Sequence, residues 1–397
     1  MNVRTSLSRF ALAATAWAVV TSGCGGGASS STSEPTSPTA TSGTTTPTGT
    51  TAPTGGTTTG GTTTTGTTTT PTGGTTTTTT PAPPAHSAHK RCAWIGADTF
   101  AAGKASFLAN PDWFDAIHPV WFSLTADGTP KGNQFVDDAD LVAAAKAHGV
   151  KIIPLVNGNS VDYMRVAMAT PASIAAHAQM LATLASTHGY DGLEMDYEHL
   201  WLATDRAPYT ALVAAVGAAL HAEGKLLTLA LPSLGSVNLA SGYDYVALQQ
   251  SADVLHLMGY DFHYLGGDHL GPIAPAGWVS DVVSYVQSLG APGKYSLGIA
   301  NYGIGAGWYA DAATAAAACL PGTFSEATTH MTICPLGHED AGIAPHCTTA
   351  QGDVWFENAH SAAEKATMAK AGGLGGVAYY TLGDEPAGFF DALAASF

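Results

Sequence analysis

Three acidic residues alternate with apolar ones where the chain reads Asp-Gly-Leu-Glu-Met-Asp-Tyr-Glu, over residues 191–198. Successive side chains of a β-strand point to opposite faces, so Glu194, Asp196 and Glu198 would share one face of a strand. Burying three carboxyl groups together is costly, because desolvation and mutual repulsion both oppose their ionisation. We therefore expect shared protons and at least one raised pKa, which a general acid near neutral pH requires.

A solvated acidic edge or a metal site would also contain such acids. The apolar residues between them, Leu193, Met195 and Tyr197, predict a strand that is covered on both faces, which disfavours an exposed edge. Divalent cations bind carboxylates, but alternate residues are stacked along a strand rather than convergent. The 15 histidines show no compact His or Cys/His ligand spacing, so we expect neither a metal ion nor a cofactor.

The elements that must hold these acids alternate between strands and helices. The strands expected from short apolar runs lie over residues 92–96, 116–124, 151–156, 192–198, 226–231, 254–261, 296–301 and 376–382. The helices expected from Ala-rich stretches lie over residues 138–148, 171–188, 207–223, 243–251, 276–289 and 360–371. This alternation predicts an α/β fold with a parallel sheet, and eight strands predict a closed (β/α)8 TIM barrel.

An open doubly wound sheet is the alternative fold, but no Gly-rich phosphate motif follows the first expected strand. In the barrel, Glu198 would lie at the carboxyl end of its strand, where the active sites of such barrels are found. Both the alternation of the acids and their place at a strand end therefore favour catalysis.

The stretch over residues 191–198 resembles the Asp-Gly-x-Asp-x-Asp-x-Glu signature of glycoside hydrolase family 18, the chitinase-type barrels. Further segments resemble motifs of that family in the same order, namely residues 258–261, 271–275, 301–303, 354–359 and 375–383, together with Trp278. They extend over most of the chain from Cys92 to Ala395. They are most similar to the branch that contains spore-cortex and peptidoglycan-lytic glucosaminidases.

This resemblance implies a role for each acid in hydrolysing glycans that contain N-acetylglucosamine. Glu198 would be the general acid and later the general base. Asp196 would orient the 2-acetamido group of the substrate, which displaces the leaving group with retention, and Glu194 would exchange a proton with Asp196. Tyr260 would donate its hydroxyl to the acetamido oxygen.

Five further residues would contact the sugar: Asp261, Tyr380, Trp308, Trp201 and Met258. Two positions depart from the family pattern. Glu194 stands where the family usually has Asp, and Tyr380 stands where it usually has Trp, a larger platform. Residues 157–160 follow the third expected strand and could either touch sugar hydroxyls or simply form a turn. A catalytically weak, lectin-like glycan-binding protein on the same barrel is the alternative function, and the presence of Glu198 favours the enzyme.

The charge balance bears on partners. Lys and Arg number 14 against 30 Asp and Glu, a net charge of −16, which argues against nucleic acid as a partner because phosphate binding needs a basic surface. We expect a monomer whose partner is a polysaccharide containing N-acetylglucosamine.

The front of the chain predicts export. Residues 1–23 combine Arg4 and Arg9 with a short apolar run and then small residues, as in a signal peptide. Small residues directly before Cys24 resemble a lipobox, which implies a lipid anchor on Cys24; an ordinary secretory signal is the alternative. Residues 24–88 are rich in Thr, Gly and Pro and predict a disordered linker before a catalytic domain over 89–397. We expect an envelope lipoprotein at the outer membrane or cell surface, or otherwise a secreted protein.

Four cysteines remain after Cys24, and export would permit disulfides. Cys319, Cys334 and Cys347 lie in one segment between the seventh strand and the last helix, and Cys92 begins the first strand. We expect one bridge within that segment, with its partners left open.

Overall fold

The computed structural model describes residues 91–158, 160–233, 242–267, 270–305, 307–326, 332–333, 338–339 and 343–396. The expected signal peptide, Cys24, the linker and Cys334 lie outside the described residues and stay predictions. In the described part of the chain, no helix has both the length and the apolar character needed to cross a bilayer.

The described residues form a closed parallel barrel, which confirms the predicted (β/α)8 fold. Its strands are β1 (Arg91–Ile95), β2 (Ala116–Leu124), β4 (Lys151–Ile152) continued by β5 (Leu155–Asn157), β6 (Gly192–Asp196), β7 (Leu226–Pro232), β8 (Val254–Met258), β9 (Tyr295–Ala300) and β16 (Gly376–Tyr380). They pair in this order, and β1 pairs with both β2 and β16, which closes the sheet. A short β3 (Pro130–Gly132) pairs antiparallel with the end of β2.

The third strand of the barrel is divided where a single strand was expected over residues 151–156. β4 pairs with the start of β2, and β5 pairs with its end after a register shift between Val120 and Phe122. Pro154 lies between the two pieces and has no N–H to donate to the ladder. The break still leaves Asn157 at the carboxyl end of β5, beside Asp196 in register.

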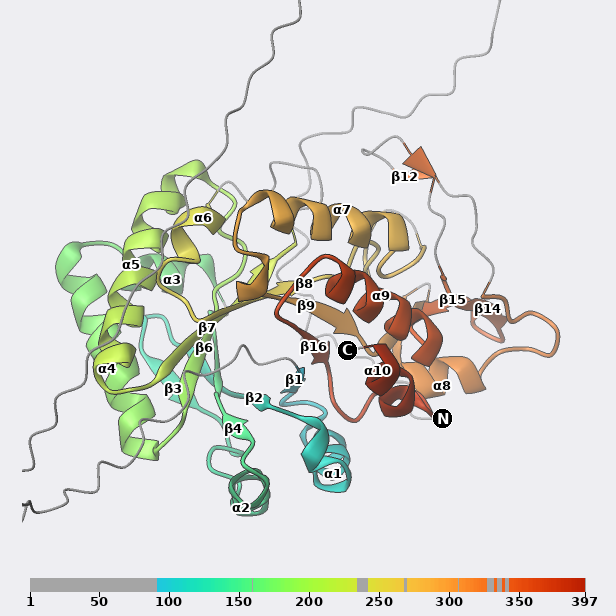
Figure 1. Cartoon of the computed structure of the whole chain (residues 1–397), viewed down its shortest axis with the longest axis horizontal. Coiled ribbons are helices and arrows are strands. Elements are labelled where there is room, and N and C mark those ends of the chain that lie inside the picture. The colour runs from blue at the N-terminus through green and yellow to red at the C-terminus, as the bar shows by residue number, and fades with distance from the viewer. Residues whose placement is uncertain are drawn as a thin grey trace, which may run out of the picture. The chain divides into compact units, whose positions relative to one another are not determined.

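Helices lie outside the strands, as Figure 1 shows for α4, α5, α7 and α9. The helices are α1 (Phe100–Ala109), α2 (Ala139–His148), α3 (Val161–Ala167), α4 (Pro171–His188), α5 (Ala203–Ala222), α6 (Tyr245–Leu248), α7 (Ala276–Ser288), α8 (Ala312–Ala317), α9 (Ala359–Ala371) and α10 (Phe389–Ser396). Two 3-10 turns cover Pro111–Trp113 and Pro292–Lys294.

The ends of α4 show why the sequence located this helix so well. Thr170 and Ser173 form a capping box, Pro171 occupies the first turn, and Gly189 ends the helix with φ of 70°. The helix α1 was not predicted, because Thr99 makes no side-chain cap and Gly103 interrupts its pattern. A Cβ on Gly103 would lie 2.8 Å from the carbonyl oxygen of Leu382, so the close approach of that backbone requires glycine.

The apolar side chains form separate clusters inside and outside the barrel wall. Leu193, Met195 and Tyr197 belong to the outer cluster between strands and helices. Trp94 and Ala230 belong to the inner cluster, which fills the barrel. Because side chains alternate along β6, the acids between these outward residues face the barrel interior, as the sequence predicted.

An additional antiparallel sheet is inserted between β9 and α9, in the order β11 (Trp308–Asp311), β10 (Tyr302–Gly305), β15 (Gly352–Phe356) and β14 (His346–Thr349). A two-stranded piece pairs β12 (Thr332–Ile333) with β13 (His338–Glu339). A buried ion pair of 2.7 Å between Glu357, just after β15, and Lys365 of α9 ties this sheet to the barrel.

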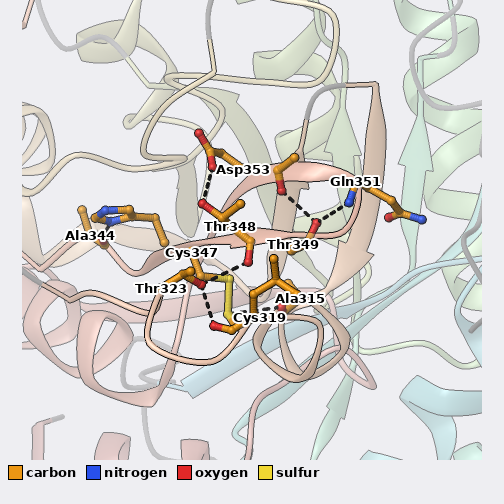
Figure 2. The surroundings of a disulfide bond; sticks show 12 residues. Ala315, Cys319, Thr323, Ala344, Cys347, Thr348, Thr349, Gln351 and Asp353 are labelled. Atoms are coloured by element: carbon orange, nitrogen blue, oxygen red, sulfur yellow. Dashed lines mark hydrogen bonds between the residues drawn. A yellow bond between two sulfur atoms is a disulfide. The ribbon is translucent and has the colours of Figure 1, made fainter.

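Figure 2 shows a disulfide between Cys319, just after α8, and Cys347 of β14. This pair confirms the expected bridge within the inserted segment. Thr323 donates its hydroxyl to the carbonyl oxygens of Leu320 and Thr348, so hydrogen bonds hold the same turn.

Removing this bridge should destabilise the inserted sheet. The cysteines are 28 residues apart in sequence, and closing a loop of that size in the unfolded chain stabilises the fold by about 3.6 kcal/mol. The variant with both Cys319→Ala and Cys347→Ala should unfold at lower temperature than the parent and be insensitive to reductant. A parent whose unfolding temperature does not change in reductant would contradict this expectation.

Candidate active site

The three acids of β6 lie at different depths. Glu194 is 0% exposed and Asp196 is 8% exposed, both on the strand and inside the barrel. Glu198 lies two residues beyond the end of β6 and is half-buried. The deepest acid is therefore closed off from solvent and the last is accessible at the barrel mouth, at the carboxyl ends of the strands.

A side-chain hydrogen bond links Asp196 and Glu198, and it raises the pKa of Asp196 while it lowers that of Glu198. Burial raises the pKa of Asp196 well above its usual value, and the nearby charges of Glu198 and Glu194 add to that rise. Burial also raises the pKa of Glu198, against the opposing effects of the His199 charge and of the hydrogen bond with Asp196. The pair therefore keeps a proton at a pH where an exposed carboxyl would have lost it.

Asn157, at the end of β5, fixes the orientation of Asp196. Its Nδ2 donates to Asp196 Oδ2 over 2.9 Å, which favours the charged form and partly offsets the rise in the Asp196 pKa. The sequence left open whether residues 157–160 contact sugar or form a turn. The structure gives Asn157 a third role, as a partner of a buried acid.

Glu194 is held by side chains on the inner faces of other strands. Trp94 Nε1 of β1 donates to Glu194 Oε2 over 2.7 Å, and His118 Nδ1 of β2 lies 3.2 Å from the same oxygen. His256 Nε2 of β8 lies 3.7 Å from Glu194 Oε1. The longer side chain of Glu, where the family usually has Asp, reaches these three side chains.

The hydroxyl of Tyr243 holds the loop that carries Glu198. It donates to the carbonyl oxygen of Tyr197 over 2.8 Å and accepts from the backbone N–H of Leu200 over 3.2 Å, so one side chain bridges the residues on both sides of Glu198. A Cβ on Gly242 would lie 1.9 Å from the carbonyl oxygen of Leu200, so only glycine lets Tyr243 approach this closely.

Tyr260 lies close enough to the acid pair to interact with it. Burial raises the pKa of Tyr260 well above its usual value. Smaller contributions in the same direction come from Tyr380, Asp261, Glu198 and Asp196. Its hydroxyl is therefore a neutral hydrogen-bond donor at ordinary pH. The structure thus brings together the four residues that the sequence assigned to catalysis.

Some of the residues predicted to contact sugar lie beside the acid site, and others do not. Tyr380 stacks on Tyr260 with ring centroids 5.7 Å apart and meets Trp94 edge-on at 6.1 Å, so it borders the acid site. Met258 packs in the same inner cluster. Asp261 accepts a hydrogen bond from the hydroxyl of Tyr302, whose aromatic ring lies against Tyr260.

The two tryptophans differ in position. Trp201 packs on His199 and Tyr243, with ring centroids 5.6 and 6.4 Å away, beside the loop of Glu198. Trp308 is 8% exposed and packs with Val354 and Phe356 in the core of the inserted sheet. Trp308 is therefore not brought to the acid site.

Sequence reasoning did not assign four side chains that contact the site residues: Trp94, His118, Tyr243 and Tyr302. Trp94 and His118 lie on predicted strands, and their inward direction follows only from the register of β1 and β2. A polar residue within a strand that is otherwise apolar was the available signal for His118. No sequence spacing connects Tyr243 to Glu198.

A buried acid paired with an accessible one, beside a tyrosine at the carboxyl end of a barrel strand, defines a site for acid–base chemistry in a (β/α)8 barrel. The family model for glycosyl hydrolases family 18 matches residues 109–385, which is more than half of the chain. The chain belongs to this family.

Relatives of known name and structure agree with this family. The Cortical fragment-lytic enzyme of Bacillus anthracis is 26% identical over 207 residues, covering 50% of this chain and 48% of that protein. The crystal structure of a chitinase from Chromobacterium violaceum ATCC 12472 matches with a TM-score of 0.66 at 26% identity, covering 78% and 99% of the two chains. The spore cortex-lytic enzyme SleL of Bacillus cereus shares the fold, with a TM-score of 0.65 at 21% identity over 78% of this chain and 74% of that one. The chain spans about half the length of the first curated relatives it matches.

Tyr243→Phe should destabilise the protein, because the Tyr197 carbonyl and the Leu200 N–H would lose a buried partner. Leaving such groups unpaired costs about 1–3 kcal/mol, measured as a lower free energy of unfolding in urea. Tyr209→Phe is the matched control, since the buried Tyr209 hydroxyl has no hydrogen-bond partner among the described residues. Equal stability of Tyr243→Phe and Tyr209→Phe would show that the bridge does not hold the loop.

Proposed function

We propose that this chain is a retaining glycosidase that hydrolyses β-linked N-acetylglucosamine glycans, with Glu198 as general acid and base. The observation that carries the proposal is the Asp196–Glu198 pair. A hydrogen bond links the two carboxyl groups, and burial raises the pKa of each. A protonated carboxyl at the mouth of the barrel is the group that a departing glycosidic oxygen needs. Membership of the family favours this chemistry over other uses of an acid pair.

In the first step, Glu198 gives its proton to the glycosidic oxygen as the bond to the anomeric carbon breaks. The 2-acetamido carbonyl oxygen of the substrate attacks that carbon, forming a cyclic oxazolinium ion rather than a glycosyl-enzyme ester. Asp196 accepts from the acetamido N–H and stabilises the positive charge that develops. Tyr260, a neutral donor, directs its hydroxyl at the acetamido oxygen.

In the second step, water attacks the anomeric carbon and reopens the ring. Glu198, now a carboxylate, takes a proton from that water and returns to its starting state. Two displacements on the same carbon leave its configuration unchanged. Atoms and protons balance with water as the only co-reactant, so the reaction requires no cofactor.

The substrate class follows from the need for a 2-acetamido group. The names of the relatives include a chitinase and cortex-lytic enzymes, so chitin oligomers and peptidoglycan are the leading candidates here. Tyr380 and Trp201, both beside the acid pair, would contact the sugar face. A catalytically weak glycan-binding protein is the alternative, and it is disfavoured because Glu198 is present.

The place of action is proposed from the sequence alone. Residues 1–23 as a signal, a lipid on Cys24 and the linker over 24–88 would hold the catalytic domain at an envelope surface, where its polysaccharide partner would lie. We propose that the domain acts there as a monomer.

Glu198→Gln tests the role of the acid, because the amide keeps the size of the side chain but cannot donate a proton to the leaving group. Hydrolysis of a chitooligosaccharide should fall by about 10²- to 10⁴-fold, while binding measured by calorimetry should persist. Glu223→Gln is the matched control, since Glu223 is exposed at the end of α5 and should leave turnover unchanged.

Two outcomes would overturn the proposed function. Equal turnover by Glu198→Gln and the parent would exclude Glu198 as the acid. Binding of both chitooligosaccharides and purified peptidoglycan by the parent, with no cleavage product detected by mass spectrometry, would favour the glycan-binding alternative.

His199→Asn tests the electrostatics of Glu198. The charge of His199 opposes the rise in the pKa of Glu198, so removing it should raise that pKa further. The protonated acid would then persist to higher pH, and the basic limb of the kcat/KM profile should move upward by less than about one pH unit. Asn is chosen because residue 199 has φ of 63°, a conformation that Asn tolerates.

His148→Asn, on the exposed face of α2, is the control for this profile and should leave it unmoved. A basic limb that stays in place or moves to lower pH in His199→Asn would contradict the assignment of that limb to Glu198.

A further inference from the structure

Three potential metal ligands converge inside the barrel below the acid pair. Cys92 of β1, His118 of β2 and His256 of β8 are each 0% exposed. One donor atom from each side chain lies within 4.8 Å of the other two. They are far apart in sequence, so only the closed barrel brings them together. The sequence therefore lacks the short ligand spacings that predict a metal site.

The environment of His118 points to a missing partner. Among the described residues, its Nε2 has no hydrogen-bond partner, and its Nδ1 lies 3.2 Å from Glu194 Oε2 without hydrogen-bond geometry, although the side chain is fully buried. The hydroxyls of Thr228 and Ser296 also lack partners there, and they are the register neighbours of Glu194 and His256. Such groups are rare in protein interiors unless an ion or water satisfies them.

Glu194 adds a feature that is common around bound metals. A histidine that binds a metal through one nitrogen usually directs its other nitrogen at a carboxylate, which fixes the ring. Here His118 Nδ1 lies 3.2 Å from Glu194 Oε2, and His256 Nε2 lies 3.7 Å from Glu194 Oε1. One carboxylate therefore faces both rings, and Trp94 holds that carboxylate in place.

The charges of such a site would also balance. A divalent ion adds two positive charges to the interior, and the Cys92 thiolate with the Glu194 carboxylate adds two negative ones. An isolated buried charge is costly, whereas a compensated set with these donors is tolerated. Two imidazoles and a thiolate are the donors that zinc prefers, with Zn–N near 2.0–2.1 Å and Zn–S near 2.3 Å.

We propose that Cys92, His118 and His256 form a buried binding site for a divalent transition ion of the zinc class. On binding, the sulfur–hydrogen bond of Cys92 breaks, its proton leaves to solvent and the thiolate coordinates the ion. One ring nitrogen of each histidine coordinates with it, and a water completes the coordination. The ion fixes the interior beneath Glu194 and takes no part in the chemistry of Glu198.

The test uses the full chain without a polyhistidine tag, equilibrated with zinc or cobalt(II) and then dialysed. Mass spectrometry of the metal should find about one ion per chain, and the cobalt(II) form should show the absorption of thiolate-to-cobalt charge transfer. Zinc should also raise the unfolding temperature. The Glu198→Gln chain should bind the ion equally, which separates this site from hydrolysis.

Cys92→Ser replaces the sulfur with an oxygen of similar size. It should abolish the charge-transfer band and weaken retention of zinc at least tenfold. His177→Gln is the matched control, because His177 is also a buried histidine but bonds Tyr197 on the outer side of β6, and it should bind as the parent does.

A parent that retains no zinc or cobalt(II) after dialysis would overturn the proposal. So would an ion that Cys92→Ser retains with an unchanged spectrum. Should Cys92→Ser fail to fold by circular dichroism, a chain with both Cys24→Ser and Cys334→Ser decides: it should keep the thiolate-to-cobalt(II) band, and loss of that band would overturn the proposal.

Discussion

The site depends on the cost of placing carboxyl groups inside a barrel that largely excludes water. In that environment the charged form loses hydration, so the acid pair at the end of β6 holds a proton that water would remove from an exposed carboxyl. The hydrogen bond between the two acids raises the pKa of Asp196 further and lowers that of Glu198. Every other feature of the site positions these two groups or changes how readily they give up the proton.

The barrel offsets the desolvation of the acids by placing polar side chains from several strands around them. Asn157 from β5 and Tyr260 beyond β8 reach the acid pair, and Trp94 from β1 reaches Glu194 below it. These residues are distant in sequence, and the closure of β1 onto β2 and β16 makes their convergence possible. A strand that was open at one edge would leave the same acids solvated and without perturbed pKa values.

Side chains outside the barrel wall also hold the backbone that carries the acids. The Tyr243 hydroxyl holds the backbone on both sides of Glu198, so the acid lies on a loop that is fixed rather than free. Tyr197 points outward between the acids and bonds His177 of α4 over 2.7 Å. Burial lowers the pKa of His177 to about 4, so the ring stays neutral and does not add a charge near the acids.

The sequence determined the fold class and the three acids, because both depend on local periodicity, whereas Tyr260 was assigned from the resemblance to the family. Alternation placed Glu194 and Asp196 inward, and the helix over 171–188 agreed at both ends because its caps are local. Tertiary structure decided which side chains contact the acids. It also placed Trp308 in the core of the inserted sheet, away from them. The convergence of Cys92, His118 and His256 likewise follows from strand register and barrel closure, which no spacing along the chain encodes.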